Sequence, residues 1–229
     1  MNPFVLPLLL VVAFSAPMAR GDGVEVDRSC AEAVARKVQR HYEAVTDLRA
    51  RFSQTRQGPG AAGLATREGT VVAAKPGRMR WSYETPEPSL LVTDGQVLWM
   101  YDPLLEEAQR LPNAGGVLSS AAVQFLMGEG DLLAAFRVEA VDCDASPVRL
   151  ELLPRTDVGY ERLSLEVDAE SGGVLASTVT DLFGNRTRVA FQDVRVNTAP
   201  EAALFTFEPP EGVEVFDLLT PSVPGGSGR

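Results

Sequence analysis

Histidine and cysteine are nearly absent from this chain of 229 residues, which has one histidine and two cysteines. His41 has no nucleophile motif beside it, and it does not form a zinc-site spacing with Cys30 and Cys143. The glycine-serine run at 225–228 lacks the Gly-x-Ser-x-Gly pattern of a nucleophile elbow. We therefore expect no enzyme, no metal and no cofactor, and keep a hydrolase that depends on His41 as the remaining catalytic hypothesis.

Positive charge is also scarce, with 21 Lys and Arg against 31 Asp and Glu and a net charge of −10. A protein that binds the phosphate backbone needs a basic face, so we expect no nucleic acid partner. Hydrophobic residues make up 45% of the chain, which is typical of a folded domain. Because no repeat or linker is visible, we expect a single domain at 22–220 and a loose tail rich in Pro and Gly at 221–229.

Long hydrophobic runs are missing except at the start of the chain, where residues 3–19 carry no charge. A spanning helix needs roughly 20 apolar residues, whereas the apolar part of a secretory signal needs only about 7 to 15. Small residues permit cleavage after Ser15 or after Gly21, and we favour Gly21. The sequence therefore predicts a signal peptide at 1–21 and export, with a retained N-terminal anchor as the alternative.

The two cysteines permit a single disulfide in an exported chain. A bridge between Cys30 and Cys143 would close a loop of about 100 residues, which is worth on the order of 4 to 5 kcal/mol in the chain-entropy model. Two free or buried thiols are the alternative.

Periodicity predicts one helix followed by many strands. Ser29 and Glu32 form a capping-box pattern, and an amphipathic stripe of apolar residues continues from Ala31 to Leu48. Twofold alternation begins at Leu48, and further strands are predicted at 67–74, 78–84, 89–93, 96–101, 107–111, 137–141, 148–153, 160–168, 174–180 and 186–194. Two short helices are predicted between 113 and 136, and the last three strands are predicted to form an antiparallel meander.

The predicted hairpin around Asp94-Gly95 is apolar on both faces. Leu98 and Met100 point one way, while Trp99 and Tyr101 point the other. Both a sandwich core and a sheet that curves around an apolar cavity explain this pattern, and periodicity alone does not separate them.

Five motifs in order resemble the periplasmic outer-membrane lipoprotein carrier family, LolA. They are FSQ at 52–54, KPGRMRWSYETP at 75–86, VTDG at 92–95, LWMYDP at 98–103 and FTFEPPEGV at 205–213. The resemblance implies a mainly β fold with a helical lid: an unclosed antiparallel barrel of about eleven strands, covered by an N-terminal amphipathic helix and a short central helical insert. It also implies a periplasmic monomer without cofactor that takes acylated lipoproteins from an inner-membrane ABC transporter and delivers them to an outer-membrane receptor.

The resemblance further implies which residues serve the site. Lys75 occupies the position of a family arginine that holds the lid closed, although lysine lacks the planar five-donor fork of arginine, and a solvated charge in the turn before Pro76 is the alternative. The positions implied to bind acyl chains or to form the lid are Met79, Trp81, Leu91, Ala122, Val123 and Phe125. Leu98 and Met100 are added as candidates from the hairpin, where the sequence leaves open whether they or Trp99 and Tyr101 face the cavity. Because one fold can hold different ligands, a lipid-binding or sensory module for another amphiphile is the alternative function.

Overall fold

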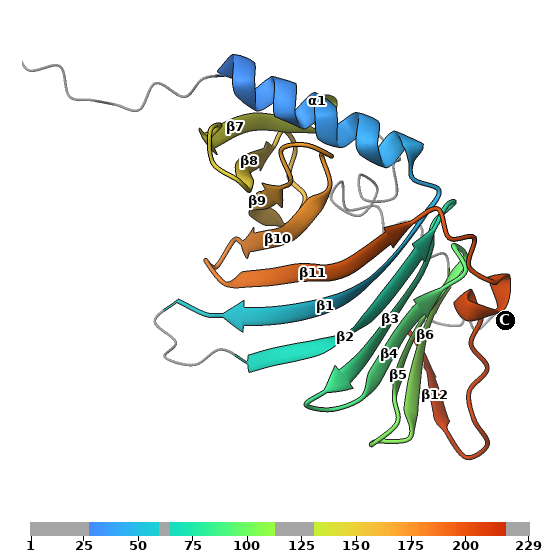
Figure 1. The fold of residues 1–229 in the computed structure, drawn as a ribbon. Coiled ribbons are helices and arrows are strands. Elements are labelled where there is room, and N and C mark those ends of the chain that lie inside the picture. Colours follow the sequence, from blue (N-terminus) through green and yellow to red (C-terminus); the bar gives the residue numbers. More distant parts are fainter. Residues whose placement is uncertain (1–27, 60–64, 113–130, 219–229) are drawn as a thin grey trace, which may run out of the picture.

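One curved sheet of twelve strands makes up most of the computed structural model, which describes residues 28–59, 65–112 and 131–218 (Figure 1). The strands are β1 (Asp47–Gln57), β2 (Ala65–Ala74), β3 (Arg78–Thr85), β4 (Ser89–Thr93), β5 (Val97–Asp102), β6 (Glu107–Pro112), β7 (Phe136–Asp142), β8 (Val148–Pro154), β9 (Tyr160–Val167), β10 (Val174–Asp181), β11 (Arg186–Val196) and β12 (Glu214–Asp217). The helices are α1 (Arg28–Ala44), α3 (Leu132–Ala135) and the 3-10 turn η2 (Ala202–Phe205).

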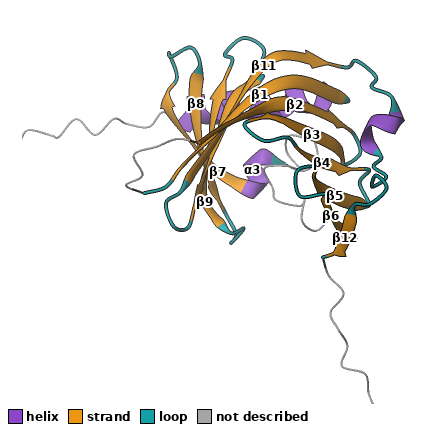
Figure 2. Ribbon diagram, turned by 90° about the horizontal axis from the view of Figure 1, so that it is seen from below, coloured by secondary structure: helices purple, strands orange, loops and turns teal. Residues whose placement is uncertain are grey.

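The strand order is β12-β6-β5-β4-β3-β2-β1-β11-β10-β9-β8-β7, and every pairing is antiparallel except that of β12 with β6. Among the described strands β7 and β12 are the two edges, so the curved sheet is an unclosed barrel (Figure 2). The predicted fold class is confirmed, and the predicted strands end within two residues of the observed ones. The predicted meander is β9, β10 and β11.

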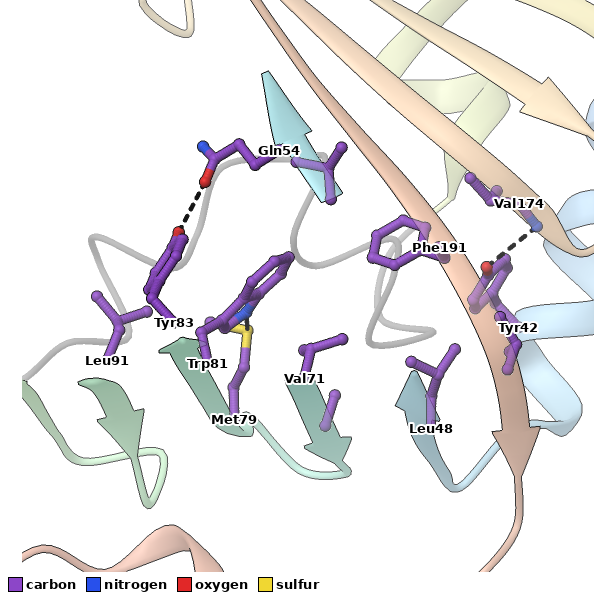
Figure 3. Close-up of a pocket in the computed structure, with 13 residues that line it drawn as sticks. Tyr42, Leu48, Gln54, Val71, Met79, Trp81, Tyr83, Leu91, Val174 and Phe191 are labelled. Carbon is purple, nitrogen blue, oxygen red and sulfur yellow. Dashed lines mark hydrogen bonds between the residues drawn. The ribbon is translucent and has the colours of Figure 1, made fainter. Parts of the chain in front are cut away.

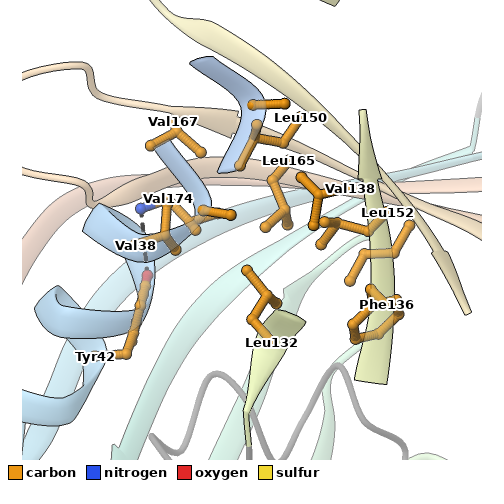
Figure 4. Packing of buried hydrophobic residues seen from close by; sticks show 13 residues of the cluster. Val38, Tyr42, Leu132, Phe136, Val138, Leu150, Leu152, Leu165, Val167 and Val174 are labelled. Atoms are coloured by element: carbon orange, nitrogen blue, oxygen red, sulfur yellow. Dashed lines mark hydrogen bonds between the residues drawn. The ribbon is translucent and has the colours of Figure 1, made fainter. Parts of the chain in front are cut away.

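Helix α1 lies across one end of the sheet and packs against β7, β8 and α3. Its fully buried residues Ala31, Ala35 and Val38 recur at helical spacing, and Ser29, the first residue of the predicted capping box, lies inside the helix. They join side chains from β7 to β10 in the largest hydrophobic core, of which Leu150 and Leu165 are completely buried (Figure 4). The face of the sheet turned toward α1 and α3 is called the inner face below.

The helix ends at Ala44, before the predicted apolar stripe reaches Leu48. Asp47 already belongs to β1, in which Leu48, Ala50 and Phe52 share one face and alternate with Arg49 and Arg51. Of the two short helices predicted between 113 and 136, the structure describes only α3, whose N-cap Asp131 accepts N–H bonds from Leu133 and Ala134. The rest of that stretch lies outside the described residues.

After β11 the chain crosses the outer face of the sheet as a C-terminal strap, residues 197–218. Phe205 of η2 is buried against Val72 and Ala74 of β2. The ring of Phe207 lies 5.5 Å from that of Trp99, and β12 then extends the sheet beside β6. Strand β12 is not among the strands predicted from the sequence.

Within the described residues, no helix is long and apolar enough to cross a bilayer. The signal peptide predicted at 1–21 and the tail predicted at 221–229 lie outside the described residues.

Candidate functional site

A cavity of about 340 Å³ lies on the inner face, between the middle strands of the sheet and the end of α1. Tyr42 comes from α1, and the remaining described lining residues come from β1, β2, β3, β4, β10 and β11 (Figure 3). The lining is Tyr42, Leu48, Gln54, Val71, Ala73, Met79, Trp81, Tyr83, Leu91, Val174, Val189, Phe191 and Val194. The volume lies within the range of small-molecule binding sites.

Strand β3 supplies the aromatic side of the cavity. Met79, Trp81 and Tyr83 alternate onto the inner face because successive strand residues point to opposite faces. Phe52 of β1 packs beneath them, with its ring centroid 4.7 Å from that of Trp81 and 5.1 Å from that of Tyr83. The Trp81 indole N–H donates to the Met79 sulfur at 2.8 Å, so the polar edge of the indole has a partner inside an apolar wall.

Two tyrosine hydroxyl groups mark the ends of the cavity. The Tyr83 hydroxyl donates to the Gln54 side-chain oxygen at 2.9 Å, and the Tyr42 hydroxyl accepts the Val174 N–H at 3.3 Å (Figure 3). Burial raises the pKa of Tyr42 to about 12, although the Val174 N–H opposes the shift. Burial also raises the pKa of Tyr83, and the Arg67 cation opposes it. Both hydroxyl groups therefore stay protonated at neutral pH.

The described lining contains no Asp, Glu, Lys, Arg, His or Cys. It offers neither a nucleophile nor an acid-base pair, and across the described residues no cluster of three or more His, Cys, Asp or Glu is placed to hold a metal ion. What this surface can do is bind apolar groups, at about 0.8 kcal/mol for each methylene removed from water.

The structure places the predicted binding residues in three groups. Met79, Trp81 and Leu91 line the cavity. Leu98 is buried beside Leu111 and in contact with Leu91, outside the lining. Met100 lines a second hollow next to the cavity. Ala122, Val123 and Phe125 lie outside the described residues.

Strand pairing decides which face of β5 points inward. Thr93 pairs with both Met79 and Leu98, and Leu91 pairs with both Trp81 and Met100. Since side chains opposite one another share a face, Leu98 and Met100 lie on the inner face. Trp99 and Tyr101 lie on the outer face, where both rings contact Phe207.

Several lining residues were not predicted from the sequence. Tyr83 shares the alternation of Met79 and Trp81, and that signal was available in the sequence. The contributions of Val189 and Phe191 depend on the pairing of β11 with β1, which brings together segments more than 100 positions apart. No local sequence pattern marks Gln54 or Tyr42 as a lining residue. Gln54 is bound by Tyr83 and Tyr42 by Val174, and both partners are distant in the sequence.

Lys75 lies in the turn between β2 and β3, close to the C-terminal end of α1. Its ammonium group donates to the backbone oxygens of Tyr42 at 2.8 Å and Glu43 at 3.3 Å. At the other end of α1, Cys30 forms a disulfide with Cys143, and the two Cα atoms are 6.4 Å apart. Both ends of α1 are therefore tied to the sheet or its loops.

Comparison with known proteins gives a family match that includes every described lining residue of the cavity except Tyr42. The family model for outer membrane lipoprotein carrier protein LolA matches residues 43–208. A protein named outer-membrane lipoprotein carrier protein from Dechloromonas aromatica (strain RCB) is 32% identical over 170 residues, covering 73% of this chain and 80% of that protein. A protein of the same name from Chromohalobacter salexigens is 33% identical over 175 residues, covering 76% and 81%.

Among solved structures, an uncharacterized conserved protein from Thermus thermophilus has a similar fold. Its TM-score is 0.51 at 15% identity, and the match covers 82% of this chain and 99% of that one.

Proposed function

This chain belongs to the LolA family of outer membrane lipoprotein carrier proteins, and from that premise we propose that its inner-face cavity holds the acyl chains of lipoproteins carried through the periplasm. We further propose that the protein acts by binding and release rather than by covalent chemistry. The observation that carries the proposal is a cavity of about 340 Å³ at the middle of the sheet, whose described lining residues are all uncharged.

The energetics of such a cavity suit a carrier. At about 0.8 kcal/mol for each methylene, burial of roughly ten methylenes contributes about 8 kcal/mol, and the cost of immobilising the ligand lowers the net binding free energy below that value. The lining supports that value with large apolar groups, and its hydroxyl groups are already paired. A receptor with a tighter site can then remove the cargo, because transfer follows the difference in affinity.

The partners follow from the same role. We propose that the carrier receives its cargo from an inner-membrane ABC transporter and passes it to an outer-membrane receptor. We further propose that cleavage after Gly21 releases the mature domain, 22–220, into the periplasm with the tail 221–229 attached. Residues 3–19 support this part of the proposal because they are uncharged and too short for a typical bilayer span.

Substitution of Trp81 tests the cavity. Trp81→Asp places a carboxylate in the apolar wall, so we expect loss of lipoprotein uptake while export continues. The matched control is Trp99→Asp, because the second tryptophan lies on the outer face of the same sheet. Lipoprotein bound to purified carrier is quantified for folded preparations of both variants. Unchanged uptake by Trp81→Asp would contradict the cavity assignment.

Depletion of the protein tests the role in the cell. We expect outer-membrane lipoproteins to accumulate at the inner membrane, and normal sorting would refute the carrier function. Mass spectrometry of the protein isolated from periplasm supplies the second test. Acylated protein as the bound ligand supports the proposal, whereas free fatty acid or glycolipid without acylated protein supports a lipid-binding module.

A further inference from the structure

A second hollow of about 320 Å³, called the polar groove here, adjoins the cavity, and its lining contains Leu90 and Tyr101 of the outer face in addition to inner-face residues. Tyr83 and Leu91 line both spaces, so the two are neighbours across these side chains. The strand register continues from one to the other, since Trp81 pairs with Leu91, Leu91 with Met100, and Met100 with Gln109. The sheet therefore carries a continuous strip that begins apolar at Trp81 and becomes polar at Gln109.

The groove has charged groups, which are absent from the described lining of the cavity. Arg67, Asp102 and Glu107 line it together with Ser89 and Gln109, while Met100 and Leu91 contribute apolar surface. A ligand that occupies both spaces would therefore need an apolar part joined to a polar part.

Arg67 lies at the boundary between the two spaces. Its guanidinium carbon is 3.9 Å from the centre of the Tyr83 ring, and one terminal nitrogen donates to the Ser89 hydroxyl at 2.8 Å. The Tyr83 hydroxyl donates a hydrogen bond to Gln54, which fixes the orientation of the ring that Arg67 stacks on. A guanidinium group has five N–H donors, and the hydrogen bond to Ser89 uses one of them. The arginine can therefore offer further donors to the oxygen atoms of a ligand.

We propose that the polar groove binds the head of the acylated cargo: the ester and amide groups that join the acyl chains to the polypeptide, and the first peptide residues after them. Arg67 donates hydrogen bonds to their carbonyl oxygens at the boundary. This proposal rests on the proposed function, because it needs an acylated polypeptide as ligand. A carbonyl that enters an apolar cavity without a donor loses its hydrogen bonds to water. A donor at the boundary therefore favours the bound position in which the acyl chains enter the cavity and the carbonyl groups stay at the boundary.

Two ligands separate the groove from the cavity: a synthetic triacylated cysteine peptide, and the neutral apolar dye N-phenyl-1-naphthylamine. Arg67→Met keeps much of the length of the side chain and removes its donors. We expect about tenfold weaker binding of the lipopeptide and unchanged binding of the dye. Arg67→Lys, which keeps a charged donor, should recover part of the loss. Arg186→Met is the matched control, since Arg186 pairs with Gln57 on the outer face.

Each outcome bears on the proposal. Equal loss for both ligands would show that Arg67 only supports the cavity wall, and an unchanged lipopeptide affinity would show that it does not contact the head; either result overturns the proposal. If the wild-type protein bound the dye but not the lipopeptide, the proposed function itself would fail. If the lipopeptide bound equally well to the wild type and to Arg67→Met, only the groove proposal would be wrong, and the proposed function would stand.

Photo-crosslinking gives a measurement that does not depend on Arg67. A benzoylphenylalanine at Gln109 probes the groove, and one at Phe191 probes the far wall of the cavity. We expect Gln109 to crosslink to the peptide part of the lipopeptide and Phe191 to its acyl chains. Crosslinks from Gln109 to acyl chains alone, or none at all, would contradict the proposed position of the head.

Discussion

At the scale of single residues, Lys75 connects the turn after β2 to the last turn of α1. The cation meets backbone oxygens at the negative end of the helix dipole, so hydrogen bonding and dipole both favour it. Arginine would offer more donors in a rigid fork, but the ammonium group already reaches two carbonyl oxygens. Tyr42 accepts this hydrogen bond with its backbone oxygen and also lines the cavity. We therefore propose that the contact keeps the α1 end of the cavity closed.

Removal of the Lys75 ammonium group should loosen that end of α1. Lys75→Met loses two hydrogen bonds at a partly exposed site, worth about 1 kcal/mol together. We expect roughly fivefold faster hydrogen exchange in the last turn of α1 and faster entry of an apolar dye. Lys75→Arg should behave like the wild type or exchange more slowly. Unchanged exchange in Lys75→Met would show that packing alone holds the helix end.

A second residue, Asp47, connects the start of β1 to the first residues of the C-terminal strap. Its carboxylate accepts hydrogen bonds from the Thr198 N–H at 2.7 Å, the Thr198 hydroxyl at 2.8 Å and the Ala199 N–H at 3.1 Å. Burial raises the pKa of Asp47, but these bonds and one from Thr46 together lower it below its usual value. The ionised form is therefore the one that stabilises the fold.

This lowered pKa predicts a dependence on pH. The unfolded carboxyl titrates near pH 3.9, so its stabilising effect is complete above that value and disappears as pH falls through the lower folded pKa. Asp47→Asn should be less stable than the wild type at pH 7, and the difference should shrink below about pH 4. Urea unfolding of both proteins between about pH 7 and about pH 2.5 measures it. If the difference in the free energy of unfolding between the two proteins stayed constant with pH, the charge of Asp47 would not contribute to stability.

At the scale of elements, the two ends of α1 are held by different contacts. The disulfide holds the beginning of the helix, and Lys75 holds its end. Cys30 and Cys143 are 113 positions apart, so the bridge restricts a long loop in the unfolded chain. Replacement of both by serine should lower the free energy of unfolding by roughly 2 to 5 kcal/mol. Urea unfolding measures the loss, and the wild type in reductant should show the same loss. A double variant as stable as the wild type would indicate that the core under α1 suffices alone.

Strands were predictable where local alternation determines them, as in β3 and β5. The site was predictable only in part, because membership of the cavity depends on register. Leu98 and Trp99 are equally apolar neighbours, and only the pairing of Thr93 with Met79 and Leu98 places one of them inside. Strand β12 is four exposed residues that pair with a distant strand, so no local pattern marks it.

At the scale of the whole molecule, the two faces of the sheet have separate tasks. The inner face of β2 and β3 lines the cavity, while the outer face of β2 packs against the C-terminal strap. Because Phe205 of the strap buries apolar surface of β2, part of the stability of the sheet comes from contacts outside the cavity. Stability and binding should therefore respond to different substitutions.

Phe205 provides the test of this separation. Its ring is 2% exposed, packs on Val72 and Ala74, and lies 5.1 Å from the Arg78 guanidinium carbon. Phe205→Ala removes a large buried side chain, so the free energy of unfolding should fall by about 3 to 5 kcal/mol. Affinity of the folded variant for the apolar dye should stay within about twofold of the wild type, whereas Trp81→Asp should lose dye binding. Thermal unfolding and dye titration measure the two effects. Loss of dye binding in folded Phe205→Ala would mean that the strap also shapes the cavity, because the strands between them would then transmit the change.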